Sequence, residues 1–198
     1  RQMCIRDSSS PNELYKLIAS TIGHRISCDN IILGNGSNEV LEFIVRATLD
    51  NKSEVIIPKH SFLVYEIISK LQNAKIITTK PDSNKSTDNY LGINLESIIE
   101  KITKKTKLIF IANPANPTGT YIKLSKIEKF LKSVPKNISI IIDEAYYEYL
   151  NPNKNKSAVS LLKKYKNLFV TRSFSKMYGL ASLRAVSYTH LTLPTILL

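Results

Sequence analysis

Short apolar runs rich in β-branched residues alternate along the chain with segments of helical periodicity, and this alternation constrains the fold most. The runs are predicted to be strands at residues 31–33, 55–57, 75–78, 108–111, 138–142 and 168–170. A strand that is apolar throughout is buried on both faces, and a helix between two such strands makes a crossover that leaves them parallel. The pattern predicts an α/β fold, a three-layer αβα sandwich with a mostly parallel sheet.

Helical periodicity predicts the layers that cover this sheet. The first helix is expected after Ser10, where Pro11 and Glu13 supply a first-turn proline and a capping-box carboxylate. Its inward face should carry Leu14, Leu17, Ile18 and Ile22. A second helix should be capped by Ser37 and point inward with Val40, Leu41, Ile44 and Val45. Further helices are predicted at residues 62–71, 95–102 and 124–131.

The composition is that of a globular chain. Its 198 residues are 43% hydrophobic and 22% charged, which is enough for one domain with a core. No apolar run reaches the length of a membrane span. Cys4 and Cys28 are the only cysteines, so the sequence indicates neither a disulfide framework nor a metal site, and we expect a cytoplasmic protein.

The net charge of +12 is compatible with binding to nucleic acid or another polyanion. The lysines are scattered, however, and no aromatic residues alternate with them as stacking platforms for bases. We therefore interpret the basic patches as solvated helix faces and expect neither a nucleic-acid partner nor a membrane partner.

Polar segments follow several predicted strands, at residues 34–39, 113–119, 143–146 and 171–176. Open α/β sheets bind ligands at the carboxyl ends of their strands, so we expect these segments to share one site. The turn at Gly34 and Gly36 opens a helix whose N–H groups attract phosphate, although such a turn is also an ordinary βα loop. The two X-Pro steps of 113–119 make a rigid loop that presents the Asn116 amide.

Asp143 and Lys176 are the candidate reactive side chains. A carboxylate at the end of a buried strand is costly without a cationic partner, so Asp143 needs one; the alternative is an N-cap or an ion pair with a nearby lysine. Glu144 should point elsewhere and have a structural role. Lys176 lies among small hydroxyl and apolar residues, where a partly desolvated lysine can act as a nucleophilic amine, whereas a single lysine is more often an exposed loop residue. Arg184 follows and can clamp a phosphate.

These groups together fit one cofactor. Lys176 would hold an aldehyde, Asp143 would face a pyridine nitrogen, and the helix start would bind a phosphate. An aldehyde, a pyridine ring and a phosphate are the functional groups of pyridoxal phosphate.

The same stretches carry a resemblance to a known family: GNGSNE from Gly34, HSFLVYE from His60, NPANPTG from Asn113, DEAYYEY from Asp143 and TRSFSKMYGLASLR from Thr171. In this order they resemble the large domain of fold-type I pyridoxal phosphate-dependent aminotransferases, and among these most closely the histidinol-phosphate aminotransferases. The resemblance implies an enzyme of histidine biosynthesis that moves an amino group from L-histidinol phosphate to 2-oxoglutarate, giving imidazole acetol phosphate and glutamate. It also implies a homodimer whose active site is completed by the neighbouring subunit.

The resemblance implies a role for each matching residue. Lys176 would bind the cofactor aldehyde and later shuttle a proton, and Asp143 would keep the pyridine nitrogen protonated. Tyr146 and Asn116 would hydrogen-bond the ring oxygen, and Phe62 would stack on the ring. The phosphate would be held by the backbone N–H groups of Ser37, Asn38 and Glu39, together with Ser173, Ser175 and Arg184.

The sequence departs from the family at Asn38, Ala115 and Ser182, where Asp, Asn and Gly are common. The ends depart further, because residues 1–8 and 185–198 do not resemble the family. We expect both to be non-native segments from sequencing-adapter read-through, flanking a partial large domain at residues 9–184 without a C-terminal small domain. Such a fragment should be impaired in activity.

Two alternatives stay open at this point. A threonine-phosphate decarboxylase-like enzyme, or an aminotransferase for another amino acid, would use the same cofactor residues with a different substrate pocket. A non-catalytic module that binds nucleic acid or anionic partners rests on the net charge alone.

Overall fold

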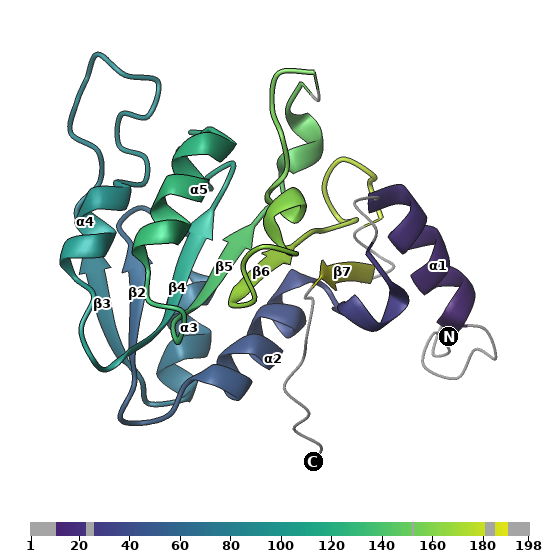
Figure 1. Ribbon diagram of the computed structural model, residues 1–198, viewed down its shortest axis with the longest axis horizontal. Helices are drawn as coiled ribbons and strands as arrows, with labels where there is room; N and C mark the ends of the chain where they lie inside the picture. Colours follow the sequence, from purple (N-terminus) through teal and green to yellow (C-terminus); the bar gives the residue numbers. More distant parts are fainter. Residues whose placement is uncertain (1–10, 23–25, 152, 181–184, 190–198) are drawn as a thin grey trace.

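A single sheet organises the chain (Figure 1), whose computed structural model describes residues 11–22, 26–151, 153–180 and 185–189. The strands are β1 (Ile31–Asn35), β2 (Glu54–Pro58), β3 (Lys75–Thr79), β4 (Thr106–Ala112), β5 (Ser139–Asp143), β6 (Leu168–Thr171) and β7 (Ala185–Thr189). Their order is β1-β7-β6-β5-β4-β2-β3, and among these strands β7 is the one that runs antiparallel to its neighbours. The predicted α/β fold with a mostly parallel sheet is confirmed.

Helices connect the strands and cover both faces of the sheet. They are α1 (Pro11–Ile22), α2 (Ser37–Thr48), α3 (Val64–Leu71), α4 (Leu95–Glu100) and α5 (Leu124–Ser133), with the short 3₁₀ helices η1 (Cys28–Asn30), η2 (Tyr147–Tyr149) and η3 (Ala158–Leu161). The predicted helices are present with slightly shifted ends. None of the helices that the structure describes combines the length and the hydropathy that crossing a bilayer requires.

Two apolar clusters fill the two sides of the sheet, because successive strand residues point to opposite faces. On one side Ile140 and Ile142 of β5 pack with residues of α1, α4, α5 and η3. On the other side Ile141 of β5 and Phe110 of β4 pack with residues of α2 and α3. These two clusters make the three layers of the predicted αβα sandwich (Figure 1).

The inward face of α1 differs from the prediction at Leu17. Ile18 is buried and Leu14 and Ile22 pack against the core as expected, but Leu17 is 64% exposed. Residues 18 and 22 are displaced from residue 14 in one direction around the helix axis, by about 40° per step of four residues. Residue 17 is displaced from residue 14 in the other direction, by about 60°, and so lies at the edge of the buried face. Tyr15 and Ala19 pack against the core in its place.

The start of α2 also differs from the prediction, because Gly36 and not Ser37 is the N-cap. Gly36 has a φ of 89°, which side-chain-bearing residues rarely adopt. It offers no side chain to the first N–H groups of the helix. Glu39 instead reaches back and accepts a hydrogen bond from the Asn35 backbone N–H at 2.6 Å. The predicted inward residues Val40, Leu41, Ile44 and Val45 are all buried.

The strand β7 is an addition to the predicted set. Its backbone pairs with β1 on one side and with β6 on the other. It lies in the segment 185–198, whose non-native origin stays a prediction. Arg184 and Ser182 lie outside the described residues, as do residues 1–8.

Candidate active site

A cavity of about 200 Å³ lies where the carboxyl ends of the parallel strands meet at one edge of the sheet. Its lining comes from the start of α2, from the segment around the start of α3, and from the loops that follow β4, β5 and β6. The predicted site residues that line it are Ser37, Asn38, Phe62, Asn116, Asp143, Tyr146, Ser173, Ser175 and Lys176. The structure therefore brings together the polar segments that were expected to share one site.

Asp143 ends the central strand β5 and is 6% exposed. Its Oδ1 accepts hydrogen bonds from Thr171 Oγ1 at 2.8 Å and from the Ala145 backbone N–H at 3.2 Å. In the part of the chain that the structure describes, no Lys, Arg or His side chain forms an ion pair with this carboxylate. Burial raises the pKa of Asp143, while these hydrogen bonds and the charge of Lys176 act in the opposite direction. Within the described ranges Asp143 thus has hydrogen bonds and the nearby charge of Lys176, but not the ion pair that was expected.

Tyr65 is a site residue that the sequence analysis did not single out. Its hydroxyl donates a hydrogen bond of 2.6 Å to Asp143 Oδ2, and its ring stacks on Phe110 with the ring centroids 4.5 Å apart. Burial, reinforced by the nearby Asp143 charge, raises the pKa of Tyr65 well above its ordinary value, so the hydroxyl keeps its proton. Tyr65 follows Phe62 by one helical turn, and this spacing is the signal that could have pointed to it.

Lys176 lines the cavity from the loop after β6, and its Nζ lies 5.2 Å from the centroid of the Tyr146 ring. The residue is exposed, which differs from the expected partly desolvated lysine. Small hydroxyl neighbours give it no apolar cover, and Met177 and Tyr178 are themselves exposed. The amine can therefore reach a ligand in the cavity from the solvent side.

Asn116 is presented by a loop that its own residues hold in shape. The buried Asn113 side chain donates to the Ile122 carbonyl at 3.0 Å and accepts from the Ile122 N–H at 2.7 Å. The Ala115 N–H donates to the Thr120 carbonyl at 2.9 Å, which closes the turn. Both X-Pro bonds, Asn113–Pro114 and Asn116–Pro117, are cis. The hydrogen bonds of Asn113 and Ala115 hold the backbone that places Asn116 in the cavity lining.

The remaining predicted residues form the polar end of the cavity. Ser37 and Asn38 are the first residues of α2, where backbone N–H groups and the helix dipole favour an anion. Ser173 is buried, and its hydroxyl accepts a hydrogen bond from the Ser175 N–H at 3.1 Å. Glu39 does not line the cavity, because its carboxylate is turned to Asn35.

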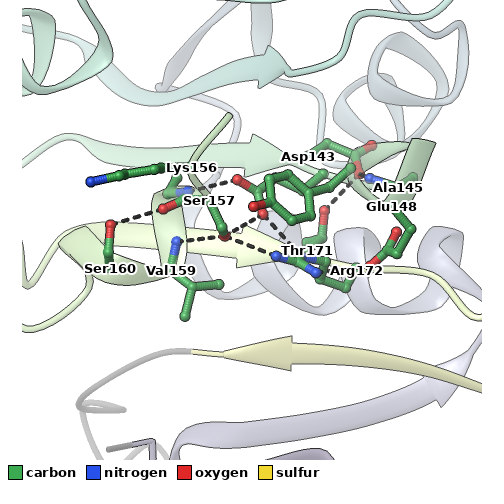
Figure 2. Close-up of polar contacts among 12 residues, drawn as sticks. Asp143, Ala145, Glu148, Lys156, Ser157, Val159, Ser160, Thr171 and Arg172 are labelled. Atoms are coloured by element: carbon green, nitrogen blue, oxygen red, sulfur yellow. Dashed lines mark hydrogen bonds and ion pairs between the residues drawn. The ribbon is translucent and has the colours of Figure 1, made fainter. Parts of the chain in front are cut away.

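Glu144 points away from the cavity and belongs to a buried ion-pair cluster with Arg172. This agrees with the structural role that the sequence predicted for it. Arg172 Nε lies 2.9 Å from Glu144, its Nη1 lies 2.8 Å from Glu148, and its Nη2 donates to Ser157 at 2.9 Å. Figure 2 shows that two adjacent residues have different partners: Thr171 is bonded to Asp143, whereas Arg172 is bonded to Ser157 and Glu148. Ser157, the hydroxyl partner of both Arg172 and Glu144, is itself buried.

This arrangement defines the ligand by its chemistry. The cavity joins an amine nucleophile, a buried carboxylate without a cation, and a helix start with hydroxyl neighbours. A ligand that complements all of them carries a group that can react with or accept a hydrogen bond from an amine, a cationic group and an anionic group. Among the described residues no cluster of three His, Cys, Asp or Glu side chains could hold a metal ion. The fold and the site thus define an α/β protein with a ligand-binding cavity at the carboxyl ends of its parallel strands.

Comparisons with known proteins agree with this class. The model of the family "Aminotransferase class I and II" matches residues 6–188, and the chain belongs to this family. A histidinol-phosphate aminotransferase of Idiomarina loihiensis is 43% identical over 82% of this chain and 42% of its own length. One of Pelagibacter ubique is 40% identical over 89% of this chain and 48% of its own length. The chain thus spans about half the length of the curated relatives it matches.

A solved structure agrees with the fold as well. The histidinol-phosphate aminotransferase of Clostridium acetobutylicum has a TM-score of 0.76 and is 28% identical, covering 90% of this chain and 50% of its own. The resemblance that the sequence motifs indicated is therefore confirmed at the level of the family.

We predict that Asp143→Asn removes a pH dependence of folding stability. Burial raises the pKa of Asp143 above that of the unfolded chain, so the stability that its bound proton contributes is present at low pH and lost as the pH rises through the folded pKa. The wild type should therefore lose stability relative to Asp143→Asn as the pH rises from about 4 to 7. Urea unfolding of the protein without added ligand at several pH values measures the difference.

Asp50→Asn is the matched control for that measurement. Hydrogen bonds from Ser53 and Lys52 lower the pKa of Asp50, so its contribution has the opposite sign and is lost as the pH falls. A stability difference between wild type and Asp143→Asn that stays constant over this pH range would contradict the prediction.

We also predict that Arg172→Met strongly destabilises the fold. The change leaves Glu144 buried without its counter-charge, which costs about 3–5 kcal/mol in comparable buried pairs. Arg46→Met removes an exposed ion pair with Glu42 and should cost at most about 0.5 kcal/mol. Equal losses in chemical denaturation of the two variants would show that the Arg172 cluster is not a stabilising one.

Proposed function

We propose that this chain is the cofactor-binding part of a pyridoxal phosphate-dependent aminotransferase that uses L-histidinol phosphate and 2-oxoglutarate. The observation that carries the proposal is the shared cavity of Lys176, Asp143 and the start of α2. When bound, pyridoxal phosphate supplies an aldehyde and an electron-withdrawing ring that stabilises negative charge on a substrate carbon. Residues 9–184 would form the large domain that holds it, in a cytoplasmic protein.

Asp143 would hold the proton of the ring nitrogen. Its carboxylate is buried and already accepts hydrogen bonds, and a protonated ring nitrogen is the cationic partner that its position calls for. A protonated nitrogen withdraws electrons more strongly, so the position of this carboxylate bears directly on the chemistry. The β5 end fixes it, because Asp143 pairs with Thr171 across the two strands.

Lys176 would anchor the cofactor through Nζ and, once released, take a proton from the substrate α-carbon. A loop that begins at the buried Ser173 holds this lysine on the cavity rim. A base that is held beside the reacting carbon has an effective concentration several orders of magnitude above that of a base in solution. Lys176 would therefore act as the general base of the transfer.

The other lining residues would orient the ring and the phosphate. Tyr146 and Asn116 are proposed to donate to the ring oxygen, and Phe62 to cover the ring face. The phosphate would lie at the backbone N–H groups of residues 37–39, with the hydroxyls of Ser173 and Ser175 and with Arg184.

The choice of substrate rests on the relatives of about 40% identity, which carry the name histidinol-phosphate aminotransferase. Neither the threonine-phosphate decarboxylase-like alternative nor the basic binding module is favoured by a contact in the site. Glutamate release from 2-oxoglutarate with L-histidinol phosphate as amino donor measures the proposed reaction.

Labelling of Lys176 tests the cofactor proposal. Borohydride treatment of the protein with pyridoxal phosphate should reduce the imine and leave a phosphopyridoxyl group on Lys176, detected by peptide mass spectrometry, because Lys176 lines the cavity. Lys176→Arg should abolish this label, while Lys163→Arg, a change outside the cavity lining, should leave it in place. Labelling spread over other lysines with none at Lys176 would sink the proposal.

A homodimer is the proposed assembly, and an apolar stripe on α3 supports it. Leu63, Ile67 and Leu71 lie one turn apart beside or on α3 and are 64%, 48% and 63% exposed. The stripe starts next to Phe62 of the cavity, so a second copy that packs on it would lie beside the cavity.

The double change Leu63→Glu and Ile67→Glu should halve the mass measured by sedimentation, because it places charges in the proposed interface. Leu17→Glu, a change at an exposed leucine of α1, should leave this mass unchanged. A wild-type protein that is monomeric at micromolar concentration would refute the dimer.

A further inference from the structure

Three hydrogen-bond donors occupy Asp143 in a way that leaves one direction open. An ionised carboxylate has about four lone-pair positions, two on each oxygen. Thr171 and the Ala145 N–H take both positions on Oδ1, and Tyr65 takes one on Oδ2. One lone-pair position on Oδ2 is left for a further donor, and Asp143 lines the cavity where a ligand would bind. Because Tyr65 also binds Oδ2, the direction of the Tyr65 hydrogen bond determines the direction of this remaining position.

We propose that Tyr65 is a positioning residue that orients the Asp143 carboxylate toward the ring nitrogen of the bound cofactor and favours the ionised form of this carboxylate. The inference rests on the proposed function and adds to it a residue that does not need to react. Tyr65 donates at 2.6 Å to Oδ2, the carboxylate oxygen that accepts fewer hydrogen bonds from the described residues, and its side chain has no exposed surface.

Packing makes Tyr65 a rigid donor. Its ring lies against Phe110 of β4 at an interplanar angle of 12°, and Phe62 meets its edge at 88° with the centroids 5.7 Å apart. Phe62 is the residue proposed to cover the cofactor ring, so one side chain connects the ring-covering residue to the carboxylate. A shift of either partner would be transmitted through Tyr65, because close-packed aromatic side chains have few alternative positions.

The charges around Asp143 leave the hydroxyl a clear role. Lys176 and Tyr146 are the other titratable side chains that line the cavity, and Glu144 faces the Arg172 cluster instead. Burial acts against the ionised form of Asp143, and the hydrogen bond from Tyr65 lowers its pKa, as do the hydrogen bonds from Thr171 and Ala145. Loss of the hydroxyl should therefore let the carboxylate take up a proton at a higher pH.

The test compares Tyr65→Phe with Tyr121→Phe. Each change deletes one hydroxyl from a tyrosine, and the Tyr121 hydroxyl donates to the Lys156 carbonyl outside the cavity. In protein without cofactor, carbon-13 NMR of labelled aspartate carboxyls should report a higher pKa of Asp143 in Tyr65→Phe and an unchanged one in Tyr121→Phe. This readout does not depend on pyridoxal phosphate, and far-ultraviolet circular dichroism checks that each variant is folded.

Cofactor affinity gives the second readout. We expect Tyr65→Phe to bind pyridoxal phosphate roughly tenfold more weakly at pH 6 to 7, as loss of a hydrogen bond to a charged group predicts, with partial recovery at higher pH. An unchanged Asp143 pKa, or an affinity loss equal at every pH, would overturn the positioning role. If the wild type binds no pyridoxal phosphate at Lys176, the proposed function fails, and the NMR comparison alone then decides whether Tyr65 controls the carboxylate.

Discussion

The carboxylate of Asp143, buried at the end of β5 without an ion-pair partner among the described residues, is the feature on which the rest of the site depends. Burying a charge of this kind costs several kcal/mol unless hydrogen bonds and a counter-charge compensate for it. Tyr65, Thr171 and the Ala145 N–H supply the hydrogen bonds and leave the counter-charge to a ligand. The protein thus keeps a destabilising group at the place where a bound cation would be held most strongly.

The alternation of side chains along β5 and β6 separates chemistry from structure. Asp143 and Thr171 are paired in register and face the cavity side, while the next residues, Glu144 and Arg172, turn to the other side and form the buried ion pair. One register therefore sets both the reactive carboxylate and the cluster that ties the two strand ends together. A shift of this strand register by one residue would turn Asp143 and Thr171 away from the cavity and bring Glu144 and Arg172 toward it. The Arg172 cluster, which joins the two strand ends, therefore stabilises the register that the site requires.

Sequence reasoning predicted the sheet, its helices and most of the cavity lining, because these depend on local periodicity and on the rule that strand ends meet at one edge. It did not predict contacts between distant segments. Tyr65 lies 78 residues from Asp143 in sequence and reads as one more inward residue of a helix. The exposure of Leu17 was missed for the related reason that only the neighbouring layer decides which part of an apolar face is covered.

The start of α2 shows the same exchange of stability for binding as Asp143. A Ser or Asp cap would satisfy one of the first N–H groups of the helix and, relative to glycine, stabilise it by roughly a few tenths of a kcal/mol. Gly36 stands at that position without a side chain, and Glu39 satisfies the backbone of Asn35 instead. The helix end therefore turns its N–H groups and Ser37 toward the cavity. A helix start that lacks a side-chain cap lies at one end of the cavity, and a carboxylate with no ion pair among the described residues is buried in its wall. One ligand that carries both an anion and a protonated ring nitrogen would complement both features.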